Sequence, residues 1–84
     1  MMYLEVMSGP MDGHRWKIDA DVVHIGSGSA ADVVIPHDRV IRAEGVVLRR
    51  RGAAFELADG SAIQEIAGGE LFQVGCTWLR VLLR

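Results

Sequence analysis

The sequence is poor in the residues that mark several large classes of protein. Its 84 residues include one cysteine, two prolines, one tyrosine, two phenylalanines and two tryptophans. The single thiol, Cys76, has no intrachain partner, so disulfide bonds play no part in the fold and a reducing compartment is the simpler expectation. We expect Cys76 to pack as a small hydrophobic side chain.

Long apolar runs and strong charge are missing as well. No apolar run approaches the roughly 18 residues that a membrane span needs, and the first residues, MMYLEVM, lack the basic start of a signal peptide. The net charge is -2 without a block of one sign, which argues against a general nucleic-acid binder. We expect one soluble, cytoplasmic domain over residues 1–84, large enough to bury about 60 to 65% of its extended-chain surface.

Glycine and proline divide the chain into short segments. They stand at positions 9, 10, 13, 26, 28, 36, 45, 52, 60, 68, 69 and 75, which leaves uninterrupted segments of mostly five to nine residues. Such lengths suit strands rather than helices, and each glycine inside a helix would cost about 1 kcal/mol. The pattern therefore predicts an all-β, two-sheet sandwich of roughly ten short strands.

The central stretch of the chain runs from Val22 to Leu48. Its apolar runs 22–25, 33–35 and 46–48 read as three strands separated by loops. The Gly-Ser segment 26–29 lacks the Gly-Lys-Ser/Thr ending of a phosphate loop, so we interpret it as a plain hairpin turn. Near the N-terminus, residues 2–6 alternate in polarity and are expected to form a hairpin with residues 14–19. Large rings dominate the burial of a small domain, so we predict as core Trp16, Phe55, Phe72 and Trp78.

No pattern of residues indicates catalysis or a cofactor. The three histidines, His14, His24 and His37, have no metal-binding spacing, and we expect no metal. The serines of the Gly-Ser segment have no evident base partner. The arginines at 49–51 could contact phosphate or acidic protein, but a solvated strand end is the simpler interpretation. We therefore predict no enzyme and no cofactor.

Five short motifs together resemble the forkhead-associated (FHA) domain, and the resemblance covers nearly the whole chain. They are Leu4-x-Val6, Val23-x-Ile25-Gly26, Ala31-Asp32-Val33-Val34-Ile35-Pro36, Val40-x-Arg42 and Gly69-Glu70-x-Phe72-x-Val74-Gly75. The resemblance implies a two-sheet β-sandwich. It also implies a site for phosphothreonine peptides in the loops at one end.

The residues at the implied phosphate site depart from the family pattern. Ser27 stands where the family has arginine, Ile41 where it has the phosphate-binding serine, and Glu44 where it has histidine. The Asn-Gly-Thr run expected after residues 59–61 is absent, and the loop before Ile66 is short. Each charge-assisted hydrogen bond is worth about 1.5 to 3 kcal/mol. We therefore expect most phosphate affinity to be lost.

A subset of the FHA family departs in the same way. The sequence resembles the cytoplasmic N-terminal domain of the YscD/HrpQ-type inner-membrane ring protein of bacterial type III secretion systems. The resemblance rests on Gly26-Ser27, on residues 31–35 and 43–48, and on Val74-Gly75-x-x-Trp78-Leu79. It implies a packing unit of a ring, beside a membrane segment that lies outside this chain, with neighbouring copies or other secretion-apparatus components as protein partners.

The sequence thus predicts a non-catalytic protein-interaction and assembly domain. The candidate contact patch comprises Ser27, Ser29, Arg39, Ile41 and Arg42. The alternative is a phosphothreonine-peptide-binding FHA module whose site is rearranged, with Arg39, Arg42 or one of the arginines 49–51 holding the phosphate.

Overall fold

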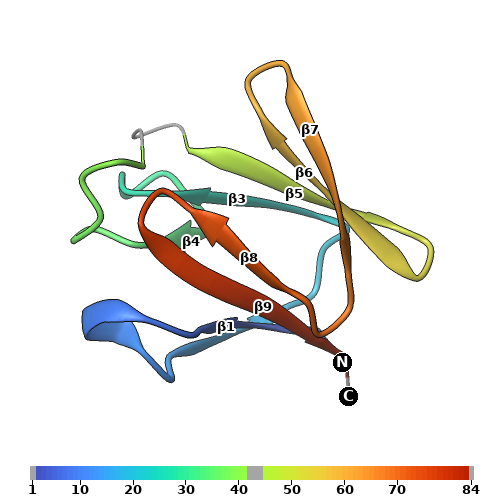
Figure 1. Ribbon diagram of the computed structural model, residues 1–84, viewed down its shortest axis with the longest axis horizontal. Helices are drawn as coiled ribbons and strands as arrows, with labels where there is room; N and C mark the ends of the chain where they lie inside the picture. Colours follow the sequence, from blue (N-terminus) through green and yellow to red (C-terminus); the bar gives the residue numbers. More distant parts are fainter. Residues whose placement is uncertain (1, 42–44, 84) are drawn as a thin grey trace.

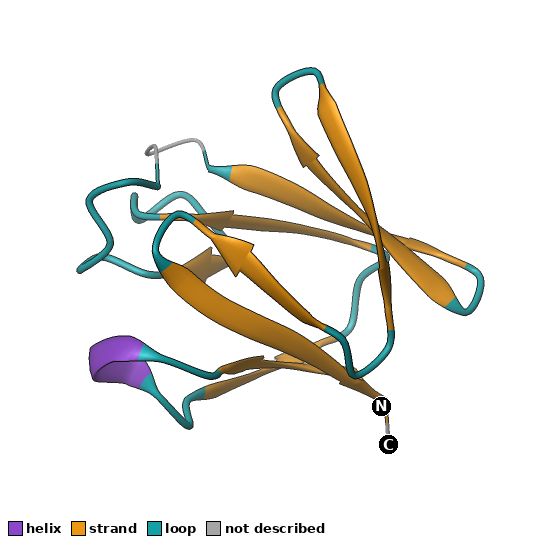
Figure 2. Cartoon of the chain, in the orientation of Figure 1, coloured by secondary structure: helices purple, strands orange, loops and turns teal. Residues whose placement is uncertain are grey.

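Two β-sheets packed face to face make up the molecule. The computed structural model describes residues 2–41 and 45–83, in which nine strands and one turn of 3₁₀ helix are found (Figures 1 and 2). The predicted all-β sandwich is confirmed. The described strands number nine, against the roughly ten expected.

The elements follow one another closely along the chain. In order they are β1 (Met2–Val6), η1 (Gly9–Met11), β2 (Arg15–Ile18), β3 (Val22–Gly26), β4 (Val33–Val34), β5 (Val46–Arg51), β6 (Ala54–Asp59), β7 (Ala62–Ala67), β8 (Leu71–Val74) and β9 (Thr77–Leu83). None of the described helical residues belongs to a segment long and apolar enough to cross a bilayer.

Most neighbouring strands pair in the antiparallel direction. One sheet has the order β2-β1-β9-β8 and the other β4-β3-β5-β6-β7. The expected hairpin of β1 and β2 is confirmed, with Leu4 opposite Trp16. The hairpin expected at the Gly-Ser segment is wrong, because β4 pairs with β3 in the parallel direction, with Ile25 opposite Val33. Residues 27–32 instead form a loop that brings the chain back alongside β3, and the Ile35 amide donates to the Gly26 carbonyl at 2.8 Å.

One hydrophobic core lies between the two sheets. It consists of the buried side chains Met2, Leu4, Val6, Val23, Ile25, Val33, Ile35, Ile41, Val46, Leu48, Phe55, Leu57, Ile66, Phe72, Val74, Leu79 and Val81. The predictions for Phe55 and Phe72 are confirmed, since each is 1% exposed. Trp16 is partly buried and packs against the core.

Two predictions about single side chains are wrong. Trp78 is 42% exposed, because its neighbours Thr77 and Leu79 are the residues of β9 that point inward. Side chains alternate between the faces of a strand, so Trp78 belongs to the outer face. Cys76 is exposed rather than packed, because it lies in the turn between β8 and β9.

Candidate interaction site at the loop end of the sandwich

Three connections meet at one end of the sandwich, on the left in Figure 1. They are the loops 27–32 and 35–41 and the turn 75–76, which we call the loop end. Both chain termini lie at the opposite end. Most residues of the predicted contact patch therefore come from two loops that follow β3 and β4.

Asp38 is the polar centre of the loop end. Asp38 is only 4% exposed. Its carboxylate accepts four hydrogen bonds: from the amides of Val40 (2.9 Å), Ile41 (3.3 Å) and Cys76 (2.8 Å) and from Thr77 Oγ1 (2.7 Å). Burial raises the pKa of Asp38, but these hydrogen bonds, led by that of Thr77, lower it more, so the pKa lies below its ordinary value. One ionised carboxylate thus holds loop 35–41 against the β8–β9 turn.

Two glycines allow the loops to approach so closely. At Gly75, with a φ of +60°, a Cβ atom would lie 2.5 Å from Ile41 Cγ1 and 2.7 Å from Asp38 Oδ1. At Gly45, with a φ of +65°, a Cβ atom would lie 1.7 Å from the Ile25 carbonyl oxygen. Both positions need the absence of a side chain as well as the left-handed backbone that glycine tolerates.

Ser27 also makes a hydrogen bond within the loop end. Its hydroxyl donates to the Ile41 carbonyl at 2.9 Å and so ties loop 27–32 to loop 35–41. Ile41 itself is 6% exposed and is part of the core. Ser29 is exposed, and its side chain makes no hydrogen bond within the described part of the chain. Of these three predicted patch residues, only Ser29 is exposed.

Arg39 and Val40 form the outward tip of loop 35–41. Both are exposed, and Val40 has 63% of its surface accessible. Val40 lines a hollow of about 230 Å³ together with Ile41, Gly45, Val46, Asp59, Val74 and Gly75. It also lines a second hollow of about 300 Å³ together with Gly9, Pro10, His37, Asp38, Arg39, Cys76 and Thr77. The tip of the loop thus presents one exposed apolar side chain, Val40, where the two hollows meet.

Two positions of the predicted site cannot be placed. Arg42, a member of the patch, and Glu44 lie outside the described residues. The region of the expected Asn-Gly-Thr run is described: β6 and β7 form a regular hairpin in which Asp59 lies opposite Ala62, so that only Gly60 and Ser61 connect the strands. A loop long enough to clamp a peptide backbone is not formed there.

The sequence interpretation missed Asp38 and Val40. An aspartate that accepts the amides two and three residues ahead is a recurrent turn pattern, and His37-Asp38-Arg39-Val40-Ile41 contains it. The turn around Asp38 could therefore be predicted from the sequence. The hydrogen bonds from Cys76 and Thr77 could not, because those residues lie 38 and 39 positions away in the chain.

A further polar cluster lies outside the loop end, on the outer face of the β2-β1-β9-β8 sheet. Glu5 is 7% exposed and stands between Arg15 at 3.0 Å and Arg80 at 2.7 Å. Its pKa lies below the ordinary value, chiefly because Arg80 and then Arg15 donate hydrogen bonds to it. The ladder register puts the three residues side by side on neighbouring strands. The cluster fastens β1 to both of its neighbours.

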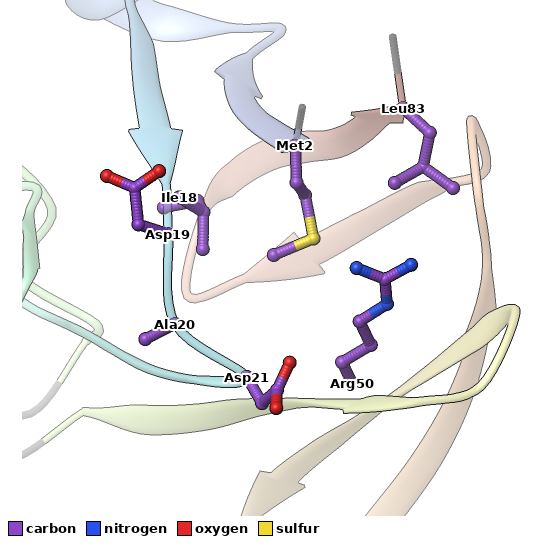
Figure 3. A pocket seen from close by; sticks show the side chains of 7 residues that line it. All are labelled: Met2, Ile18, Asp19, Ala20, Asp21, Arg50 and Leu83. Carbon is purple, nitrogen blue, oxygen red and sulfur yellow. The ribbon is translucent and has the colours of Figure 1, made fainter.

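A hollow of about 510 Å³ lies at the end with the termini (Figure 3). Its lining residues are Met2, Ile18, Asp19, Ala20, Asp21, Arg50 and Leu83. Figure 3 shows Arg50 of β5 reaching toward Met2 and Leu83 of the facing sheet. Within residues 2–41 and 45–83, no group of three or more histidine, cysteine, aspartate or glutamate side chains could hold a metal ion.

The fold has counterparts among solved structures. An FHA domain from an analysis of phosphothreonine-dependent FHA interactions overlays with a TM-score of 0.78 at 19% identity, covering 99% of this chain and 96% of that chain. The FhaA FHA domain, solved in complex with the intracellular domain of Rv3910, gives 0.75 at 19% identity, with 96% and 99% covered. The FHA domain of the CT664 protein from Chlamydia trachomatis gives 0.81 at 15% identity, with 99% and 97% covered.

These likenesses extend over the whole domain. They show that the chain has the FHA sandwich fold, and the predicted resemblance is confirmed at that level. No family model and no curated protein matches the sequence.

Proposed function

We propose that this chain is a non-catalytic protein-interaction and assembly domain that contacts its partner through the loop end without a phosphate group. One observation carries the proposal. Val40 is exposed and lines two hollows, while two polar groups of the loop end, the Asp38 carboxylate and the Ser27 hydroxyl, are already bonded within the domain. An exposed apolar side chain beside polar groups that are already bonded suits a contact made by packing rather than by new hydrogen bonds.

The polar chemistry of the loop end argues against tight phosphate binding. Ser27, at the position of the family's arginine, uses its proton for the Ile41 carbonyl. Ile41, at the position of the family's serine, is buried, and its side chain has no hydrogen-bond donor. Asp38, three positions before Ile41, carries a negative charge that would repel a phosphate at the loop end.

The alternative, a phosphothreonine-binding module with a rearranged site, is favoured by Arg39. This side chain is exposed at the loop end, and none of the ion pairs in the described ranges 2–41 and 45–83 includes it. A guanidinium can bind a phosphate through two hydrogen bonds. A single cation at the rim of an apolar surface, however, supplies only part of what phosphate recognition needs.

At the finer level, we propose a component of the inner-membrane ring of a type III secretion system. The support is the sequence resemblance to the YscD/HrpQ-type domain, especially serine at position 27 and the run 31–35. The partners would be neighbouring copies or other proteins of the apparatus. The domain would stand on the cytoplasmic side, where a single unpaired thiol is stable.

Site-specific photo-crosslinking tests this function. A photoreactive phenylalanine replaces Val40 in the full-length protein in its own cell, and a second variant carries the same residue at Lys17, which is exposed on β2. We expect Val40 to yield a discrete adduct with another copy or with an apparatus protein, and Lys17 to yield none. Equal yields at both positions would remove the basis for a loop-end interface.

A further inference from the structure

Two large apolar side chains are exposed next to each other on the outer face of the β2-β1-β9-β8 sheet. Leu71 of β8 is 52% exposed and Trp78 of β9 is 42% exposed. The ladder places Leu71 opposite Arg80 and Gln73 opposite Trp78, so Leu71 and Trp78 are diagonal neighbours on adjacent strands. Diagonal neighbours lie about 7 to 8 Å apart, within reach of an aromatic ring. Neither side chain belongs to the core, and the loop-end function uses neither.

The other exposed large apolar side chains of the described residues stand apart from one another. Val22 lies on β3 and Ile63 on β7, with β5 and β6 between them. Val40 lies at the loop end, and Leu83 lines the hollow at the end with the termini. Single exposed apolar residues are normal on a protein surface. An adjacent pair that includes Trp78 is a stronger indication of a contact surface.

The backbone of Trp78 is held on both sides. Its amide donates to Ser8 Oγ at 2.9 Å, and its carbonyl accepts from the Met7 amide at 2.8 Å. β9 is also paired with β1 along one edge and with β8 along the other. Because the backbone is already fixed, a partner that covers the ring has little left to order, which lowers the entropic cost of binding.

A net positive charge lies beside the apolar pair. Arg80 and Arg15 both pair with Glu5, at 2.7 and 3.0 Å. One carboxylate cannot neutralise two guanidinium groups, so two cations against one anion leave a charge of +1, in a chain whose net charge is -2. The side chain of Arg80 is 34% exposed. The complementary group on a partner is therefore an acidic one.

The outer face of β9 alternates between apolar and basic side chains. Trp78, Arg80 and Leu82 point to this face, because Leu79 and Val81 point into the core. Side chains on one face of a strand follow one another at about 6.6 to 6.8 Å. An extended segment that presents an apolar, an acidic and an apolar side chain at every second residue has the same spacing and the opposite charge.

We propose that the outer face of β8 and β9, centred on Trp78, binds an extended acidic segment of another protein. A carboxylate of that segment, placed between two apolar side chains, meets Arg80 between Trp78 and Leu82. Tryptophan and arginine are enriched among the side chains that dominate interface affinity. Lys17 lies on β2, two strands and about 10 Å from β9, and stays outside the contact. The surface differs from the loop end, so either proposal can fail without the other.

A lipid surface fits this face less well than an acidic protein segment. Recognition of anionic lipid typically takes a cluster of about four to eight lysine and arginine side chains. Even with Lys17 included, three cations against Glu5 leave a charge of only +2 on the face. The contact with a short segment is also small, so we expect weak binding that decreases as salt is added.

Titration of the parent domain with a designed peptide, followed by amide chemical shifts in NMR, tests the proposal. The probe is capped Thr-Leu-Thr-Glu-Thr-Leu-Thr. One control peptide has lysine in place of glutamate, and another has serine in place of both leucines. We expect saturable shifts centred on β8 and β9, with binding at least about fivefold tighter for the probe than for either control. Equal binding of the three peptides, or no saturable shift at millimolar concentration, would overturn the proposal.

Three substitutions locate the contact. Trp78→Gln and Leu71→Gln should each weaken probe binding at least about fivefold. Ile63→Gln is the matched control, because Ile63 is 68% exposed on the outer face of the other sheet, and it should leave binding unchanged. All three positions are exposed, and the dispersion of each NMR spectrum checks that the variant is folded. Unchanged binding in Trp78→Gln, or an equal loss in Ile63→Gln, would contradict the assigned surface.

Two further measurements distinguish the other possible occupants of this face. The parent and Trp78→Gln are sedimented alone and with vesicles of phosphatidylcholine and phosphatidylserine. We expect a monomer that does not bind the vesicles. Vesicle binding that is lost in Trp78→Gln would assign the face to lipid, and a homodimer that is lost in Trp78→Gln would assign it to a second copy of the chain. Either result, without probe binding, would overturn the proposal.

Discussion

The loop end and the β6–β7 hairpin stabilise their backbones in different ways. At the loop end, irregular backbone is held by side chains: Asp38 accepts four hydrogen bonds and Ser27 donates one. In the hairpin, the backbone is held by its own regular ladder, and the side chains of Ile63, Gln64 and Glu65 are exposed. The side chains of Asp38 and Ser27 at the loop end are therefore committed to structure, whereas those of Gln64 and Glu65 in the hairpin are exposed.

Because of this difference, residues at the implied phosphate site can serve the structure of the domain instead of binding a ligand. The sequence resemblance implies that Ser27 and Ile41 stand at phosphate-binding positions, yet Ser27 donates to a backbone carbonyl and Ile41 is part of the core. Substitutions at the loop end should mainly change stability where they touch this network. Substitutions at exposed positions should mainly change contacts.

The largest effect is expected for Asp38→Ala. The change removes the acceptor of four hydrogen bonds and leaves the hydroxyl of Thr77, which is 3% exposed, without its partner. We expect a loss of about 3 to 5 kcal/mol in the free energy of unfolding, less than the sum of the separate bonds because they act together. Chemical denaturation measures it. Asp59→Ala, at an exposed aspartate of the hairpin, is the control and should cost under about 0.5 kcal/mol.

A somewhat smaller loss is expected for Ile41→Ser. The substitution restores the residue type of the family's phosphate site, but it empties part of the core and buries a hydroxyl. We expect about 2 to 4 kcal/mol of destabilisation. Val40→Ser, one residue earlier but 63% exposed, should change stability by less than about 0.5 kcal/mol. Similar melting temperatures for the two variants would mean that Ile41 is not a core residue.

The pH dependence of stability should reflect Asp38. Its pKa is lower in the folded state than in the unfolded state, so its contribution is complete above the unfolded pKa and is lost as pH falls through the folded pKa. Glu5 and Asp32 act in the same direction. We expect stability to fall below about pH 4. The fall should be shallower in Asp38→Asn, and identical slopes for parent and variant would show that Asp38 does not titrate as inferred.

The smallest effect is expected for Ser27→Ala. It removes one partly buried hydrogen bond to the Ile41 carbonyl, worth about 1 kcal/mol. Ser29→Ala is the control, because Ser29 is exposed and two positions away on the same loop. A difference between the two variants in thermal melts isolates the bond that joins the loops. No difference would place Ser27 outside the network.

The sequence was sufficient for the fold where burial alternates along a strand. In β1, Met2, Leu4 and Val6 point inward as their period-two pattern indicates. In β9, Thr77–Leu83 reads TWLRVLL, with apolar residues on both faces, so the pattern cannot decide which face is buried. Trp78 was assigned to the wrong face for that reason. Size and hydrophobicity alone do not place a ring in the core.

Less of the candidate site than of the fold could be predicted from the sequence. The sequence resemblance indicated which loops would lie at one end of the sandwich, and in the structure the Ser27 hydroxyl joins loop 27–32 to loop 35–41. The resemblance could not show that Ile41 is buried or that Asp38 joins loop 35–41 to the β8–β9 turn, because these depend on contacts between distant segments. The parallel direction of β4 relative to β3 could not be predicted for the same reason.

One calorimetric experiment tests the central claim that the loop end binds protein without phosphate. A library of phosphothreonine peptides and its unphosphorylated twin are titrated into the parent domain and into Arg39→Ala. We predict no saturable phosphate-dependent heat, so that any dissociation constant is weaker than about 1 mM. Micromolar binding that requires the phosphate and is lost in Arg39→Ala would contradict the claim and establish a rearranged phosphothreonine site.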